Sequence, residues 1–103
     1  MSAHKNTPDW AEARIEIYFK TWCPYSRKAL ALLSNKGVPF AGIDVTSDRV
    51  REAKMIDRSG RTSVPQIFVD GAPLGGSDEL SAFVDSGAFD DRFGPAEDAL
   101  RAA

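Results

Sequence analysis

The order of predicted strands and helices constrains the fold of this chain more than any other feature. Strand-like segments at 14–19 and 38–45 are each followed by a helix-like segment, and a strand pair and a third helix complete the series. A strand, a crossover helix and a second strand form a parallel pair, whereas the Asp70-Gly71 turn joins antiparallel strands. The sequence therefore predicts an α/β fold in the order β-α-β-α-β-β-α, with a four-stranded mixed β-sheet flanked by helices.

Residues that start or stop helices mark the predicted boundaries. Pro24 is expected in the first turn of the first helix, and Gly37 is expected to end it. The second helix begins at a capping Ser47 or Asp48 and ends at Gly60. Its expected inward-facing residues are Val50, Ala53 and either Met55 or Ile56. Ser77 and Asp78 occupy the expected cap positions of the third helix, and a further short helix is expected from Pro95.

Length, charge and cysteine count narrow the possible classes of protein. The 103 residues predict a single domain over 1–103, in which residues 1–12 are flexible or form a short N-terminal extension. A net charge of −2 gives no electrostatic footprint for nucleic acid. No apolar run approaches the about 18 residues that a membrane span needs, so no membrane partner is expected. One cysteine excludes an internal disulfide, which favours a cytoplasmic protein, and no cluster has metal-ligand spacing.

The single cysteine lies in the segment TWCPYS, where the first predicted helix begins. Backbone N–H groups and the positive end of the helix dipole favour the thiolate form of Cys23 there. Such a position lowers a cysteine pKa from about 8.5 into a range of about 3.5–7.5, and the thiolate is the nucleophile of thiol–disulfide exchange. Lys20, Arg27 and Lys28 add positive charge nearby. Alternatively, Cys23 is a small buried residue with a purely structural role. The sequence pattern by itself therefore identifies Cys23 only as a candidate reactive thiol.

Three separated motifs then resemble the glutaredoxin family, in particular its small bacterial class-I type. They are Cys-Pro-Tyr-x at 23–26, the Val-Pro pair at 64–65 that enters a strand, and Gly-Gly-x-Asp at 75–78 before a helix. The resemblance runs from about Arg14 to about Phe93 and implies a thioredoxin fold. It also implies that glutathione is the co-substrate and that protein–glutathione mixed disulfides or other disulfides are reduced.

The resemblance assigns a role to each matching residue. Cys23 is the expected nucleophile, Lys20 pairs with a glutathione carboxylate, and Tyr25 flanks the bound tripeptide. A cis peptide bond before Pro65 is implied, which leaves the backbone of Val64 to pair with the cysteinyl backbone of glutathione. Ser63 and Arg61 are weaker candidates, the latter for the glycyl carboxylate. The family match places Gly76, Ser77 and Asp78 around the γ-glutamyl group, at a helix N-terminus that offers N–H groups. Each also has an ordinary structural explanation, such as a solvated lysine or a helix cap.

Ser26 departs from the Cys-Pro-Tyr-Cys pattern of many relatives. A serine cannot form the intramolecular disulfide of a dithiol mechanism, so a monothiol cycle is expected in which a second glutathione releases the first. The Ser26 hydroxyl can still support the Cys23 thiolate with a hydrogen bond. Ser26 is either the natural residue or an engineered Cys→Ser replacement that traps the mixed disulfide.

Two other functions remain open at the level of sequence. Some monothiol relatives with Cys-Gly-Phe-Ser bridge a [2Fe–2S] cluster between two protomers. Pro24-Tyr25 and the short spacing from Lys20 to Cys23 set this chain apart from them. The other possibility is a redox-inert binding domain that keeps only the scaffold. The favoured prediction is a monomer whose partners are glutathione and glutathionylated or disulfide-containing proteins.

Overall fold

The computed structural model describes residues 14–94, and the expected N-terminal extension and the expected helix from Pro95 lie outside them. The predicted order β-α-β-α-β-β-α is confirmed, with one further short helix, α5, after the last predicted element. The elements are β1 (Ile15–Phe19), α2 (Pro24–Lys36), β2 (Ala41–Asp44), α3 (Arg49–Ser59), β3 (Gln66–Val69), β4 (Ala72–Gly75), α4 (Ser77–Asp85) and α5 (Ala88–Phe93).

The four strands form one mixed sheet in the order β2-β1-β3-β4. β1 and β2 are parallel and are joined through α2, whereas β3 is antiparallel to both β1 and β4. Asp70 and Gly71 turn the chain between β3 and β4 with φ angles of 51° and 85°, as a tight hairpin with two positive φ angles requires. The predicted mixed α/β sheet flanked by helices is therefore confirmed.

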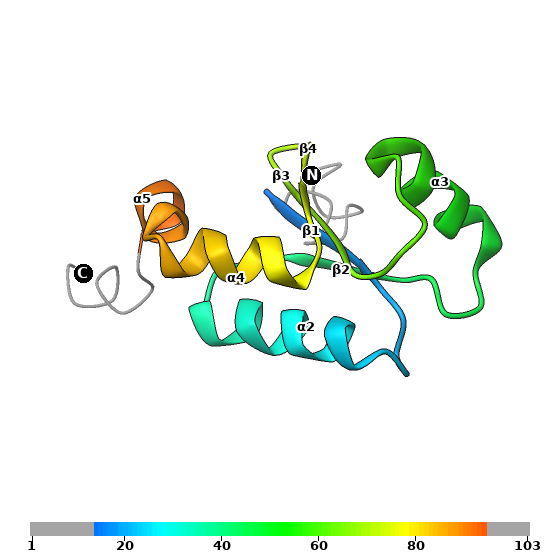
Figure 1. The fold of residues 1–103 in the computed structure, drawn as a ribbon, viewed down its shortest axis with the longest axis horizontal. Coiled ribbons are helices and arrows are strands. Elements are labelled where there is room, and N and C mark those ends of the chain that lie inside the picture. The colour runs from blue at the N-terminus through cyan, green and yellow to red at the C-terminus, as the bar shows by residue number, and fades with distance from the viewer. Residues whose placement is uncertain (1–13, 95–103) are drawn as a thin grey trace, which may run out of the picture.

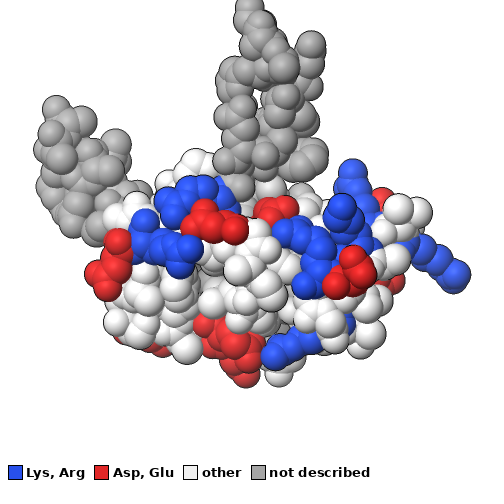
Figure 2. Space-filling view, turned by 90° about the horizontal axis from the view of Figure 1, so that it is seen from above, with Lys and Arg blue, Asp and Glu red and all other residues white. Residues whose placement is uncertain are grey.

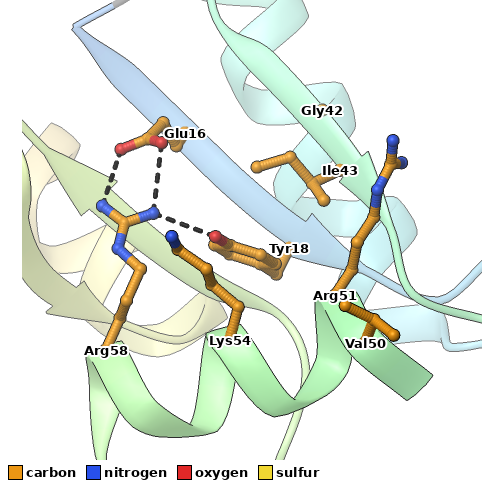
Figure 3. A pocket seen from close by; sticks show the side chains of 8 residues that line it. All are labelled: Glu16, Tyr18, Gly42, Ile43, Val50, Arg51, Lys54 and Arg58. Carbon is orange, nitrogen blue, oxygen red and sulfur yellow. Dashed lines mark hydrogen bonds and ion pairs between the residues drawn. The ribbon is translucent and has the colours of Figure 1, made fainter. Parts of the chain in front are cut away.

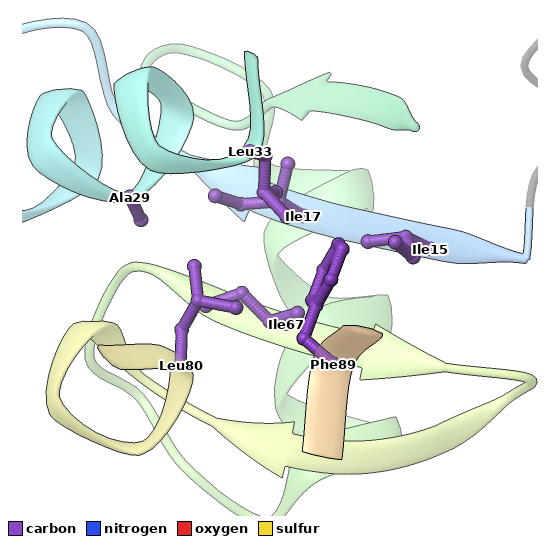
Figure 4. Close-up of a cluster of buried hydrophobic side chains, with 7 residues drawn as sticks. All are labelled: Ile15, Ile17, Ala29, Leu33, Ile67, Leu80 and Phe89. Carbon is purple, nitrogen blue, oxygen red and sulfur yellow. The ribbon is translucent and has the colours of Figure 1, made fainter. Parts of the chain in front are cut away.

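Helices cover both faces of the sheet, with α2 and α4 on one face and α3 on the other (Figure 1). The larger core cluster lies between the sheet and helices α2 and α4, and α5 contributes Phe89 to it (Figure 4). Its buried members are Ile15, Ile17, Ala29, Leu33, Ile67, Leu80 and Phe89. Under α3, a smaller cluster consists of Tyr18, Val45, Met55 and Phe68. Because successive residues of a strand face opposite sides, Ile17 and Tyr18 serve different clusters.

Three boundary predictions are confirmed, but the predicted inward face of helix α3 is wrong at two positions. Gly37 and Gly60 end their helices with φ of 74° and 73°, and Asp48 caps α3 by accepting a hydrogen bond from the Arg51 N–H. Val50 and Ala53 were both expected to face inward, but both are exposed, Val50 by 81%. Within α3 only Met55 is buried. Arg58 covers the neighbouring apolar surface instead, since its guanidinium lies 4.0 Å from the centre of the Phe68 ring.

Acid should remove a contribution of Asp70 to stability. Arg14 donates to both carboxylate oxygens of Asp70, at 2.7 and 2.9 Å, and Arg92 donates to one of them at 2.8 Å. The hydrogen bonding from Arg14 is the main cause of a pKa lowered to about 2. A depressed pKa stabilises the fold above the ordinary pKa of the group, and this contribution is lost as the pH falls through the folded value. Asp70→Asn should therefore lower the urea midpoint at neutral pH, with the difference shrinking between about pH 4 and about pH 2.

Asp57→Asn is the matched control, because Asp57 is exposed and forms no ion pair with any residue between 14 and 94. A gap for Asp70→Asn that does not change with pH would contradict the assignment of this effect to the carboxylate charge.

Candidate active site

Cys23 stands at the point where the loop after β1 becomes helix α2. It is the N-cap residue, with extended backbone angles of φ −84° and ψ 120°, and Pro24 occupies the first helical position. Its carbonyl accepts the first helical hydrogen bond from the Arg27 N–H at 3.0 Å. The residue is only 6% exposed, and its thiol donates to the Val64 carbonyl oxygen at 3.8 Å. The predicted place of the thiol at a helix N-terminus is confirmed.

The surroundings of Cys23 lower the pKa of its thiol. Burial alone raises this pKa, but hydrogen bonds from the Ser26 backbone N–H, the Ser26 hydroxyl and the Tyr25 backbone N–H outweigh that effect. The charge of Arg27 adds a smaller lowering contribution. Each of these groups favours the negative form of the sulfur, so the site supports a nucleophilic thiolate.

Ser26 is held in place for this contact. It is fully buried on the first turn of α2, and its Oγ accepts a hydrogen bond from the backbone N–H of Lys20 at 3.2 Å. A hydroxyl has one hydrogen to donate, and because its oxygen already accepts from Lys20, that hydrogen remains for the sulfur of Cys23. Ser26 is thus placed to support the thiolate form of Cys23.

Ser26→Ala should raise the pKa of Cys23, because the hydroxyl donor is lost while burial still disfavours the thiolate. The pH dependence of thiolate ultraviolet absorbance, or of the alkylation rate with iodoacetamide, measures this pKa. Ser34→Ala is the control, since Ser34 is exposed near the other end of α2. An unchanged titration curve in Ser26→Ala would show that the hydroxyl does not support the thiolate.

Lys20 contributes less to the surroundings of the Cys23 thiol than its position three residues before Cys23 suggests. Its ammonium lies 3.0 Å from a carboxylate oxygen of Glu52 and 5.7 Å from the centre of the exposed Trp22 ring. Arg27, rather than Lys20 or Lys28, supplies the charge that lowers the Cys23 pKa. Because Lys20 pairs with Glu52, it lies near Cys23 but does not line the cleft described next.

A cleft of about 200 Å³ lies between the start of α2, the segment before β3 and the start of α4. Eight of the nine residues that the resemblance assigns to glutathione line it, and the exception is Lys20. The eight are Tyr25, Arg61, Ser63, Val64, Pro65, Gly76, Ser77 and Asp78. The Val64 carbonyl, which accepts from the Cys23 thiol, connects this cleft to the sulfur.

Gln66 and Glu79 also line the cleft, and the sequence prediction missed both. The buried Gln66 amide donates to the backbone oxygen of Ser63 at 3.0 Å and to its hydroxyl at 3.2 Å, which fixes the segment before β3. That segment contains the cis Val64–Pro65 peptide bond that the resemblance implies. Among residues 14–94, the backbone N–H of Val64 has no hydrogen-bond partner, so it is available to a ligand.

The start of α4 differs by one residue from its prediction. Gly76 is the N-cap, and its N–H donates to Glu79 Oε1 at 2.7 Å, so Ser77 and Asp78 occupy the first helical turn. The acidic residue three places after the cap was the available signal. A Cβ on Gly76 would lie 3.3 Å from the Pro65 carbonyl oxygen. The glycine therefore lets the helix N-terminus approach the segment before β3.

In the part of the chain between 14 and 94, no group of three or more His, Cys, Asp or Glu side chains is arranged to hold a metal ion. None of the helices described there has the length and apolar character needed to cross a membrane.

Comparison with known proteins agrees with this arrangement. A family model described as Glutaredoxin matches residues 15–73, a stretch that includes Cys23 and the Val64–Pro65 pair. Glutaredoxin 3 of Escherichia coli (strain K12) is 47% identical over 78 residues, which are 76% of this chain and 94% of that protein. The solution structure of glutaredoxin from Brucella melitensis is 40% identical with a TM-score of 0.66, covering 77% of this chain and 86% of that one.

Oxidized glutaredoxin 2 from Chlamydomonas reinhardtii has the same fold at 28% identity, with a TM-score of 0.66 and 79% coverage of each chain. The family model spans more than half of the 103 residues, and the relatives span most of both chains. This chain therefore belongs to the glutaredoxin family of thiol–disulfide oxidoreductases, with a thioredoxin fold.

Proposed function

We propose that this protein reduces protein–glutathione mixed disulfides by a glutathione-dependent monothiol mechanism. The observation that carries the proposal is a single thiol with a lowered pKa beside a cleft that has polar groups at both ends. The sequence contains one cysteine, so no dithiol step within the chain is available. Any disulfide formed at Cys23 must then be resolved by a thiol from outside.

The cleft offers complementary groups along the length of a tripeptide. Arg61 provides a cation for the glycyl carboxylate, and the backbone of Val64 provides strand-type hydrogen bonds for the cysteinyl residue. At the far end, the first turn of α4 presents N–H groups to the γ-glutamyl carboxylate, and Asp78 accepts from its ammonium. Tyr25, with 62% of its surface exposed, forms the side wall.

The reaction then follows two balanced thiol–disulfide exchanges. The Cys23 thiolate attacks the glutathione sulfur of the mixed disulfide, a Cys23–glutathione disulfide forms, and the protein substrate leaves as a thiolate. A second glutathione thiolate attacks the glutathione sulfur of that disulfide, which yields oxidised glutathione and regenerates the Cys23 thiolate. Across both steps, one reduced glutathione and the mixed disulfide become oxidised glutathione and a free protein thiol, so one disulfide is exchanged for another without any further oxidant or reductant.

The alternative is a glutathione-ligated [2Fe–2S] cluster shared by two chains. Such clusters are commonly held by four thiolates, which would be Cys23 of each chain and the sulfurs of two glutathiones, so this function requires a dimer. The redox proposal needs one chain and one sulfur. A monomeric state and a cytoplasmic location accompany it as predictions.

Steady-state reduction of a glutathionylated peptide tests the proposal, with excess glutathione and glutathione reductase coupled to NADPH oxidation. Turnover should depend on glutathione, and Asp78→Asn should lower kcat/KM for glutathione by about tenfold or more, because a charge-assisted hydrogen bond is weakened. Asp85→Asn is the control at the other, exposed end of α4. Reduction that proceeds equally well without glutathione would contradict the mechanism.

A further inference from the structure

A second and larger pocket lies under helix α3, on the sheet face opposite α2 and α4 (Figure 1). Its volume is about 410 Å³, within the range of about 300–1,000 Å³ that is typical of small-molecule sites. Ile43 and Tyr18, which pair across β2 and β1, form its floor, and α3 forms its wall (Figure 3). None of its lining residues lines the cleft beside Cys23.

The charge of this pocket is positive although the whole chain has a net charge of −2. Lys and Arg side chains gather over the side of the molecule where α3 lies (Figure 2). The pocket itself is lined by three cations, Arg51, Lys54 and Arg58, and by one carboxylate, Glu16. A concave surface of one sign concentrates ligands of the opposite sign.

The three cations are not equally engaged with other groups. Arg58 donates to both carboxylate oxygens of Glu16, at 3.1 and 2.9 Å, and to the Tyr18 hydroxyl at 3.0 Å (Figure 3). Arg51 contacts Asp48 at 3.4 Å in a solvent-exposed pair, which is a weak interaction. Within residues 14–94, Lys54 forms no ion pair. Two cationic groups therefore remain available beside a pair that is already neutralised.

An apolar wall stands next to these two groups. Val50 is 81% exposed, and Ile43 below it is partly buried against the smaller core cluster. The aliphatic stems of Arg51 and Lys54 extend the same wall, as long cationic side chains commonly do. An ion without an apolar part would leave this surface in water, whereas an organic anion would cover it.

We propose that the pocket under α3 binds a small organic anion, with its charged group beside the ammonium of Lys54 in the positive field of Arg51, and its apolar body against Val50 and Ile43. The ligand class is a carboxylate, sulfonate or phosphate ester attached to an aryl or alkyl group. This site is independent of Cys23 and of the proposed redox reaction, since the two sites share no lining residue.

Fluorescence titration with anilinonaphthalene sulfonate, an aryl sulfonate probe, tests this site in the full chain. Binding should saturate at one probe per chain, and Lys54→Gln and Arg51→Gln should each weaken it by about threefold to fivefold. Lys28→Gln is the matched control, because Lys28 is exposed on α2 and lies outside the pocket. The uncharged analogue N-phenylnaphthylamine should bind more weakly, and added salt should weaken the sulfonate only.

Amide chemical shifts in the unmodified protein locate the probe without any variant. The shifts should change at Gly42, Ile43, Val50, Arg51 and Lys54, and glutathione should not displace the probe. Shifts confined to 61–66 and 76–79, displacement by glutathione, or equal affinity of all three variants would each overturn the proposal.

Discussion

Replacing Cys23 by serine is expected to reduce glutathione-dependent turnover by more than about a thousandfold, because the nucleophile of a covalent mechanism is removed. No other sulfur nucleophile exists in the chain to replace it, since Cys23 is its only cysteine. Serine is nearly isosteric and can still stand at the N-cap, so circular dichroism and the thermal midpoint should stay close to those of the parent. The coupled peptide assay measures the loss.

Ser26→Ala serves as the partner of this variant in the same assay. It keeps the sulfur and changes only the support of the thiolate, so it should retain turnover with a shifted pH profile. Residual activity of Cys23→Ser near the parental rate would place the chemistry on another group and would contradict the mechanism.

Phe68→Ala is expected to have the largest effect on stability, a loss of about 3–5 kcal/mol. Phe68 is fully buried on the central strand β3. Its ring meets the Tyr18 ring edge-to-face, with 5.6 Å between the ring centroids, and lies under the Arg58 guanidinium. Its removal leaves a cavity under a helix that buries only Met55, so the surroundings have little apolar side chain with which to refill the space. Because a small domain has a total stability of only about 5–15 kcal/mol, urea unfolding should reveal the loss clearly.

Phe83→Ala is the matched comparison on helix α4. Phe83 is only partly buried and touches Phe89 at a centroid distance of 5.8 Å, so its truncation should cost clearly less than that of Phe68. Equal losses for the two variants would contradict the view that α3 and the smaller cluster depend on this one ring.

Local signals in the sequence were enough to predict the order of strands and helices and the position of the thiol at the start of a helix. Pro24 opens α2, Gly37 and Gly60 end their helices in the left-handed conformation, and Asp70-Gly71 turns the hairpin. Each of these depends on a residue and its immediate neighbours, whose backbone preferences are strong. The position of Cys23 at a helix N-terminus could be predicted for the same reason, because a few neighbouring residues determine where a helix starts.

Contacts between distant segments could not be predicted in this way. Lys20 pairs with Glu52 and Arg58 pairs with Glu16, and no pattern in the sequence joins these partners. Val50 was expected inside on the basis of its apolar side chain, but Arg58 covers the adjoining surface and Val50 faces a pocket. Gln66 was missed because its role is to hold Ser63, which is a matter of tertiary geometry.

The cleft was predicted only in part from local signals, and the family resemblance supplied the rest. Residues separated by more than fifty positions, Tyr25 and Asp78 among them, were assigned to one site through the family resemblance, and the structure brings them together. Spacing alone would not have joined the two segments, because the adjacency depends on the order of strands in the sheet.

The most direct test of the monothiol cycle is the intact mass of the reduced protein after exposure to oxidised glutathione, followed by the addition of reduced glutathione. The mechanism predicts one glutathione per chain, attached at Cys23, and complete removal of the adduct by reduced glutathione with release of oxidised glutathione. An adduct that persists, or a Cys23 that never acquires glutathione, would contradict the central claim that this single thiol both accepts and returns glutathione.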